Sequence, residues 1–84
     1  MRASVIVTVC AGEGGYTYDI EVPTDIECRK VLADVMDALS AMGVDISELK
    51  NARKMYSIRL QRFLDDHESF GSSGIWNGDV ITIR

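Results

Sequence analysis

Residues 16–27 read Tyr16-Thr17-Tyr18-Asp19-Ile20-Glu21-Val22-Pro23-Thr24-Asp25-Ile26-Glu27 and lead from a strand directly into a helix. The first seven residues alternate between apolar and polar side chains, which predicts a strand with one buried face. Pro23 ends this strand, because proline cannot donate to a strand ladder. The next four residues have the Thr-x-x-Glu spacing of a capping box, in which the Thr24 hydroxyl accepts from the Glu27 amide. We therefore expect a helix to begin here.

The segment after this box has the periodicity of an amphipathic helix. Its apolar residues recur at helical spacing and predict one buried stripe, formed by Cys28, Val31, Leu32, Val35, Leu39 and Met42. The charged residues Glu27, Lys30, Asp34 and Asp37 lie away from this stripe. Gly43 stands where a left-handed cap ends a helix. We expect Val44 to fold back onto the helix end, and residues 45–48 to form a second capping box.

Strand periodicity returns on both sides of this unit. Residues 4–10 alternate with Val5, Val7 and Val9 on one face, and a glycine-rich turn over residues 11–15 joins them to the strand at 16–22 in an antiparallel hairpin. After the helix, Tyr56, Ile58 and Leu60 alternate with Ser57, Arg59 and Gln61. Phe63 and Leu64 suggest a short edge strand, Phe70 a core anchor, and residues 71–74 a turn. The last strand is residues 80–83, with Ile81 and Ile83 inward.

One helix and one sheet must bury their apolar faces against each other, because the chain offers no other cover. The first and last strands are apolar on both faces, as central strands tend to be, so we expect them side by side and parallel. The hairpin partner then lies on one side and the third strand on the other. The prediction is an α+β fold: a β-grasp with a mixed sheet in strand order 2-1-5-3-4, forming a single domain over residues 1–84.

Composition limits the classes of function. The chain has 84 residues and a formal net charge of -4, which counts against nucleic-acid binding and against docking on anionic lipid. A domain this small has a modest core, which counts against a large enclosed active site. No apolar run approaches the length of a membrane span, so we expect no membrane insertion. Two cysteines are too few for a disulfide framework and favour a cytoplasmic protein with reduced thiols.

Segments that could suggest a phosphate, metal or catalytic site are each explained more simply as structural features. The glycines of residues 12–15 lack the following Lys-Ser/Thr of a phosphate loop. Residues 65–68 read Asp-Asp-His-Glu, but adjacent residues rarely converge on one ion, so a solvated loop is favoured. Cys28 begins the apolar stripe and is expected to be a buried thiol, whereas Cys10 lies on the outer face. We predict no catalytic residue, no cofactor and no metal site, and hence no enzyme.

The C-terminal residues carry a more specific signal. They read Ser73-Gly74-Ile75-Trp76-Asn77-Gly78-Asp79-Val80-Ile81-Thr82-Ile83. This resembles the G-I-x-N-G-D ending of the YukD/EsaB group, which are ubiquitin-like proteins encoded with bacterial type VII (ESX-type) secretion systems. The resemblance covers nearly the whole chain, including the Val22-Pro23-Thr24 entry to the helix. Residues 45–54 match no motif of this group. Related domains form the cytosolic part of the membrane component EccD.

The resemblance implies a non-conjugated protein–protein interaction module, an accessory or regulatory component of such a secretion system. Its partners would be other proteins, for example the secretion membrane components, or a second copy. Two alternatives remain. A ubiquitin-like sulfur carrier or modifier is disfavoured, because that chemistry needs a C-terminal Gly-Gly and this sequence ends Thr82-Ile83-Arg84. A stand-alone EccD-like domain that dimerises, through a sheet edge or the Ile6/Val80 face, is the other.

The predicted partner-binding surface is the outer sheet face. Strand parity places Ser57, Arg59 and Gln61 there, beside four residues of the two central strands. Ile6 and Val80 would form a small apolar centre and Arg59 a charge at its rim. Trp76 could either bind a partner or fold over the edge of the core, and the sequence does not decide between these. The candidate residues are Ile6, Thr8, Arg59, Trp76, Val80 and Thr82.

Overall fold

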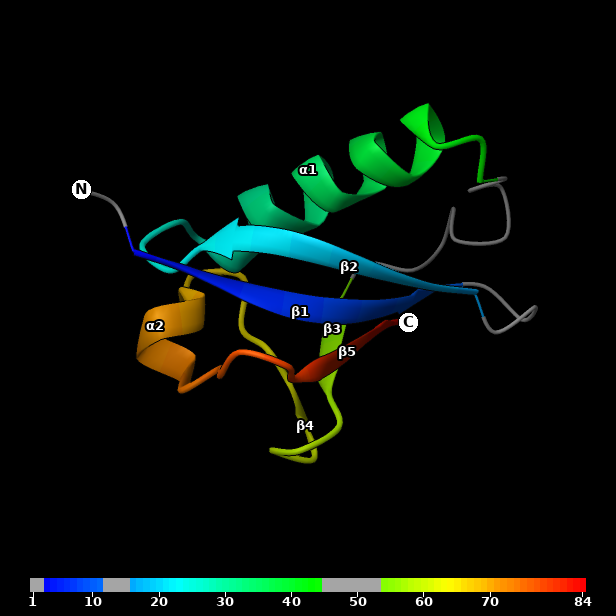
Figure 1. Cartoon of the computed structure of the whole chain (residues 1–84). Helices are drawn as coiled ribbons and strands as arrows, with labels where there is room; N and C mark the ends of the chain where they lie inside the picture. Colours follow the sequence, from blue (N-terminus) through cyan, green and yellow to red (C-terminus); the bar gives the residue numbers. More distant parts are fainter. Residues whose placement is uncertain (1–2, 12–15, 45–53) are drawn as a thin grey trace.

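The computed structural model describes residues 3–11, 16–44 and 54–84, and Figure 1 shows its five-stranded sheet with the long helix lying across one face. The elements, in chain order, are β1 (Ser4–Ala11), β2 (Tyr16–Pro23), α1 (Cys28–Ala41), β3 (Met55–Ser57), β4 (Arg62–Phe63), α2 (Phe70–Ser73) and β5 (Val80–Ile83). Ala11, predicted as the start of the glycine turn, is the last residue of β1. The rest of that turn, residues 12–15, and the predicted capping box at residues 45–48 lie outside the described residues.

The strands lie in the order β2-β1-β5-β3-β4, as the sequence predicts. The first two strands form an antiparallel pair in which Val5 stands opposite Val22. The first and last strands run parallel, with Thr8 opposite Val80, and β5 then pairs antiparallel with β3. A parallel pair of central strands and antiparallel neighbours make a mixed sheet. The α+β fold and the predicted topology are therefore confirmed.

The core forms between α1 and the facing side of the sheet. Val7, Val9, Val22, Ile81 and Ile83 point into it from the strands. The helix contributes a buried stripe that matches the predicted one at Cys28, Val31, Val35 and Leu39, with Leu32 packed at its margin. The prediction for Met42 is wrong, because the helix ends at Ala41 and the side chain that follows it is exposed. Gly43 has the predicted positive φ, and Val44 donates back to the Leu39 carbonyl.

The start of α1 differs from the predicted capping box. The helix begins one turn later than Thr24, and its N-cap is Glu27, which makes no side-chain cap bond. The Thr24 hydroxyl donates instead to the Ala3 carbonyl. The first helical amides donate to the loop after β4: Cys28 N–H to the Glu68 carbonyl at 2.7 Å and Arg29 N–H to the Asp66 carbonyl at 3.1 Å. Orphan donors of the helix end are thus satisfied by a distant segment.

Strand β3 ends earlier than predicted, and its parity is the opposite of the predicted one. Met55 and Ser57 face the core, and Tyr56 faces outward. The prediction that Ser57 and Gln61 lie on the outer sheet face is wrong for this reason. The Ser57 hydroxyl accepts from the Leu60 amide at 3.1 Å, and Gln61 adopts a positive φ of 55°, so the chain turns directly after the strand. Ser57 is therefore a buried polar residue at an inward position that an apolar residue would normally occupy.

The segment predicted as a turn at residues 71–74 overlaps the one-turn helix α2, which begins at Phe70. Ser69 caps it through a reciprocal capping box with Ser72. Phe70 is buried as predicted and anchors this turn to the core. The Gly71 amide donates to the Thr24 carbonyl at 2.9 Å, and a Cβ at this position would lie 3.0 Å from the same oxygen. Glycine is therefore needed at Gly71, because the two segments cross closely there.

One buried hydroxyl on β5 lacks a hydrogen-bond partner among the described residues and should lower the stability of the fold. The Thr82 Oγ1 atom is buried and has no hydrogen-bond partner within the described residues. An unsatisfied buried polar group costs free energy, and valine has nearly the same shape and a high strand propensity. We expect Thr82→Val to raise the free energy of unfolding by about 1 kcal/mol. Urea denaturation followed by circular dichroism measures this, and a destabilised variant would contradict it.

Candidate functional site

The loop between α2 and β5 is fixed to β1 by its Asn-Gly-Asp sequence. The Asn77 Oδ1 atom accepts from the Ile6 amide at 2.8 Å. The Gly78 amide donates to the Ile6 carbonyl at 2.8 Å, and a φ of 84° at this glycine allows that turn. The Thr8 amide then donates to the Asp79 carbonyl at 2.9 Å. The three residues thus extend the contact between β1 and β5 beyond the end of β5.

Asp79 and Arg59 form the centre of this arrangement. The Asp79 carboxylate is 7% exposed and accepts from Arg59 Nε at 2.8 Å and from Nη2 at 2.9 Å. It also accepts from the Trp76 amide at 2.8 Å, while Arg59 donates to the Gly74 carbonyl. The Arg59 guanidinium holds the pKa of Asp79 below its ordinary value. This bidentate pair closes the loop and fixes the planar guanidinium in one orientation.

The indole of Trp76 lies against that guanidinium. The Arg59 Cζ atom is 3.7 Å from the ring centroid, which is a cation–π contact. The Trp76 side chain is nevertheless 64% exposed, so the structure places it on the surface rather than over the core. Ile6, which the neighbouring Asn77 and Gly78 contact, is 52% exposed. We call Ile6, Arg59, Trp76 and Val80 the Trp76 patch.

The other predicted residues lie on the same outer sheet face. Thr8 stands opposite Val80 across the central pair, and its hydroxyl donates to Asp19 at 2.8 Å. Thr82 stands between Cys10 and Tyr56. Arg59 was predicted to lie on the third strand, but β3 ends at Ser57 and Arg59 follows it. Its side chain is held beside Trp76 by the ion pair with Asp79.

Sequence reasoning missed a pair of aromatic side chains, Tyr56 and Phe63, that pack together away from the core. Tyr56 packs edge-on against Phe63 with ring centroids 5.1 Å apart, and Phe63 is 46% exposed. Arg84 lies over the Tyr56 ring, with Cζ 4.2 Å from the centroid. Finding this pair from the sequence would have required the correct parity of β3, which turns Tyr56 to the outer face opposite Phe63 of β4.

Two groups with reactive side chains have structural roles here. Cys28 is buried as predicted, and burial together with the nearby Glu68 and Asp66 charges raises the pKa of its thiol to about 11. In the loop predicted to be solvated, residues 65–67 are exposed, as expected, but Glu68 also holds the loop in place. Glu68 accepts from Arg62 at 2.8 and 3.1 Å and from the Ser73 hydroxyl at 2.7 Å. Within residues 3–11, 16–44 and 54–84, no group of three or more His, Cys, Asp or Glu side chains is arranged to hold a metal ion.

Nearly the whole sequence matches a known family. The family model described as WXG100 protein secretion system, protein YukD, matches residues 4–83. The chain belongs to the YukD family. Its match includes the Asn-Gly-Asp loop and all five strands of the sheet. Among curated proteins, none matches the chain significantly. In the part of the chain that the structure describes, no helix is long and apolar enough to cross a membrane.

Solved structures confirm that this YukD-family chain has the ubiquitin-like fold. The ubiquitin-like domain of EccD5 from Mycobacterium xenopi has 16% identity and a TM-score of 0.67, covering 98% of this chain and 93% of that one. A ubiquitin-like protein from Trypanosoma brucei has 18% identity and a TM-score of 0.71, covering 100% and 96%. The corresponding domain of yeast Ddi1 has 23% identity and a TM-score of 0.67, covering 96% and 87%. At these identities the likeness shows the fold alone.

Proposed function

We propose that this chain is a non-conjugated interaction module that docks, through the Trp76 patch, on other protein components of a type VII secretion system. The family match supports the system, because its description names the WXG100 secretion apparatus. The structural likeness to the ubiquitin-like domain of EccD5 supports only the fold on which this proposal builds. The proposed location is the cytoplasm, where the thiols of Cys10 and Cys28 would stay reduced, and neither is in a disulfide here.

The observation that carries the proposal is the exposure of Trp76. A tryptophan that is 64% exposed leaves a large apolar surface in water, and tryptophan is enriched among the residues that dominate binding energy. Arg59 holds the ring on one face and Asp79 holds Arg59, so the indole is already oriented. A partner therefore has less conformational entropy to remove on binding. Ile6, whose backbone bonds to Asn77 and Gly78 of the same loop, adds a second exposed apolar side chain.

The test places a photoreactive amino acid at Ile6 in the native host, followed by mass spectrometry of the crosslinked proteins. We expect a component of the secretion system to be captured. Trp76→Ala in the same chain should reduce that product at least tenfold, which is the effect expected of a hot-spot residue. Secretion of WXG100 proteins by a deletion strain should be restored by the wild-type chain and not by this variant.

Met42→Ala is the matched control. It also removes an exposed apolar side chain, 53% exposed, but at the end of α1 rather than beside β5. We expect it to crosslink and to restore secretion like the wild type. Capture that excludes every secretion component, or equal loss in both variants, would overturn the proposed function.

A further inference from the structure

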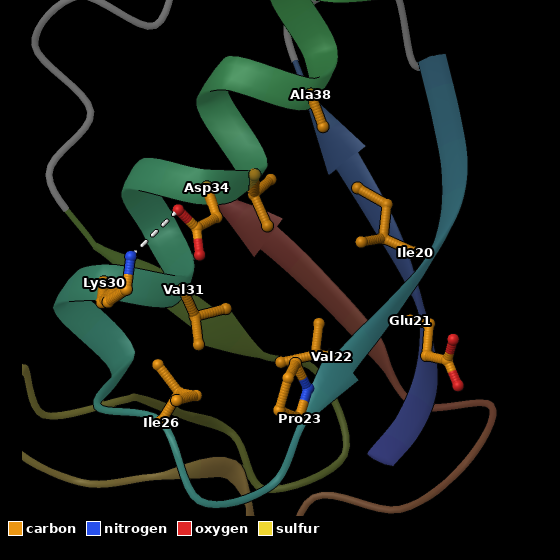
Figure 2. Close-up of a pocket in the computed structure, with 10 residues that line it drawn as sticks. Ile20, Glu21, Val22, Pro23, Ile26, Lys30, Val31, Asp34 and Ala38 are labelled. Atoms are coloured by element: carbon orange, nitrogen blue, oxygen red, sulfur yellow. Dashed lines mark ion pairs between the residues drawn. The ribbon is translucent and has the colours of Figure 1, made fainter. Parts of the chain in front are cut away.

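A groove runs between β2 and α1, on the opposite side of the sheet from the outer face. Its volume is about 300 Å³, and Figure 2 shows the side chains of Ile20, Ile26 and Val31 directed into it. Ala38 lines one end of it, and the ion pair of Lys30 and Asp34, 3.5 Å apart, lies on the helix beside it. The lining is mainly aliphatic, so the groove can accept apolar side chains.

Strand β2 is the outermost strand of the described sheet, and its register shows which backbone groups point outward. The backbone of Ile6 and of Thr8 bonds toward the β5 side. Backbone groups alternate in direction along a strand, so the intervening Val5 and Val7 pair with β2. Their partners in β2 are Val22 and Ile20, with Tyr18 next in the same series. The N–H and C=O groups of Thr17, Asp19 and Glu21 therefore point away from the sheet.

This edge can take one further strand over a limited length. Pro23 follows in the outward-pointing series and has no N–H, so pairing ends before it. A strand added beside residues 17–21 would place every second side chain over the groove and the others over the outer face. Main-chain hydrogen bonds would supply part of the affinity, and the groove would select the side chains.

The outer face at this edge carries negative charge. Asp19 accepts from the Thr8 hydroxyl at 2.8 Å, and Glu21 accepts from the Ser4 hydroxyl at 2.7 Å. These hydroxyl partners are neutral, so the bonds seen among the described residues do not compensate either charge. Side chains opposite Asp19 and Glu21 on an added strand would be their direct cross-strand neighbours, where an opposite charge stabilises and a like charge destabilises.

We propose that the β2 edge binds an extended segment of a partner protein in which apolar residues alternate with Lys or Arg. The apolar residues enter the groove, and the basic residues stand opposite Asp19 and Glu21. A second copy of this chain is a poor occupant, because antiparallel β2–β2 pairing would set these two carboxylates against each other. The inference rests on the proposed role as an interaction module, but it uses a surface other than the Trp76 patch.

The probe is a blocked seven-residue peptide with valine at odd positions and lysine at even positions, compared with the same peptide carrying glutamate for lysine. Fluorescence anisotropy at low salt should show binding of the lysine peptide about tenfold tighter, from two favourable and two unfavourable cross-strand charge pairs. Amide hydrogen exchange should slow at Asp19 and Glu21 on binding. The amide of Ile20, already bonded to β1, should change little.

Two alanines of α1 supply a matched pair of variants. Ala38 lines the groove, whereas Ala33 is exposed on another face of the helix. We expect Ala38→Leu to weaken the lysine peptide about tenfold, because one aliphatic side chain loses its place in the groove. Ala33→Leu should bind like the wild type, since leucine is nearly as good a helix former as alanine. Circular dichroism of both variants checks that the fold is kept.

Charge reversal gives the decisive comparison. Asp19→Lys with Glu21→Lys should bind the glutamate peptide in preference, while Asp66→Lys, in the loop after β4, should keep the preference for lysine. Equal binding of both peptides, or exchange that slows only at the Trp76 patch, would overturn the inference. So would concentration-dependent dimerisation that Ala38→Leu abolishes, because the occupant is then a second copy.

Trp76→Ala should bind the peptide normally, and Ala38→Leu should keep the crosslink at Ile6, which separates this inference from the proposed function.

Discussion

Replacing Asp79 with alanine should lower the free energy of unfolding by roughly 3 kcal/mol, because three hydrogen bonds end on one carboxylate. The side chain is 7% exposed and accepts from two nitrogens of Arg59 and from the Trp76 amide. Its removal leaves a cation and a backbone N–H without their acceptor. Urea denaturation followed by circular dichroism measures the change, and the loop that links β5 to β1 should exchange its amides faster.

The same variant should also lose the crosslink at Ile6. Arg59 stacks on Trp76 only while Asp79 holds the guanidinium in place, so the indole loses its fixed orientation. Asp79→Asn is the matched control, because its amide oxygen can still accept from the Trp76 amide. We expect a loss of about 1 kcal/mol for it and partial docking. A fully stable Asp79→Ala chain would show that this carboxylate does not hold the loop.

Sheet order followed from the sequence because the periodicity of four segments was strong. The alternation of residues 16–22 and the stripe of α1 each have one solution that buries their apolar faces. Strands that are apolar on both faces, at Val5–Val9 and Val80–Ile83, had to be central. These choices left one economical topology, and the structure has it.

Local errors occurred where a distant segment supplied the contact. Thr24 has the right neighbours for a capping box, but its hydroxyl donates to the Ala3 carbonyl. The helix begins later, at Cys28, where its first amides donate to the carbonyls of Glu68 and Asp66. No local pattern shows that a loop some forty residues away in the chain will lie there. Ser57 is the opposite case: the alternating pattern predicts an outward serine, whereas its hydroxyl closes a turn from inside the core.

Strand parity predicted which candidate residues share a face, but it did not predict the contacts that position them. Strand parity placed Ile6, Thr8, Val80 and Thr82 on one face, and the register confirms that placement. The position of Trp76 depended on its contact with Arg59, which joins a turn after β3 to a loop before β5. Side-chain pairing across such a distance has no signature in one sequence. For the same reason, the β2 groove appears only once the helix is placed.

Replacing Glu68 with glutamine should lower the free energy of unfolding at neutral pH by roughly 2 kcal/mol. Glu68 accepts from both terminal nitrogens of Arg62, from the Asp65 amide at 2.8 Å and from the Ser73 hydroxyl. Its backbone carbonyl also accepts from Cys28 at the start of α1. The charged side chain therefore holds the loop that satisfies the helix amides. Glutamine fills the same volume without the charge.

The pH dependence identifies this residue. The pKa of Glu68 is lowered from 4.5 to about 2. The hydrogen bonds from Arg62 are the largest cause, followed by those from the Asp65 amide and the Ser73 hydroxyl. A carboxyl group with a depressed folded pKa binds more protons in the unfolded chain, so its stabilisation is complete above pH 4.5 and is lost as pH falls toward 2. The difference in stability between wild type and Glu68→Gln should shrink over this range.

Subtracting the two curves removes the contribution of the other carboxylates, among them Asp79, whose pKa is also lowered. Glu27→Gln is the matched control, because Glu27 is an exposed N-cap residue that makes no side-chain cap bond. Its difference from wild type should stay small at every pH. A Glu68→Gln difference that remains constant from neutral pH to pH 2 would mean that the carboxylate charge does not support α1, and that the loop is held by its backbone carbonyls and Phe70 alone.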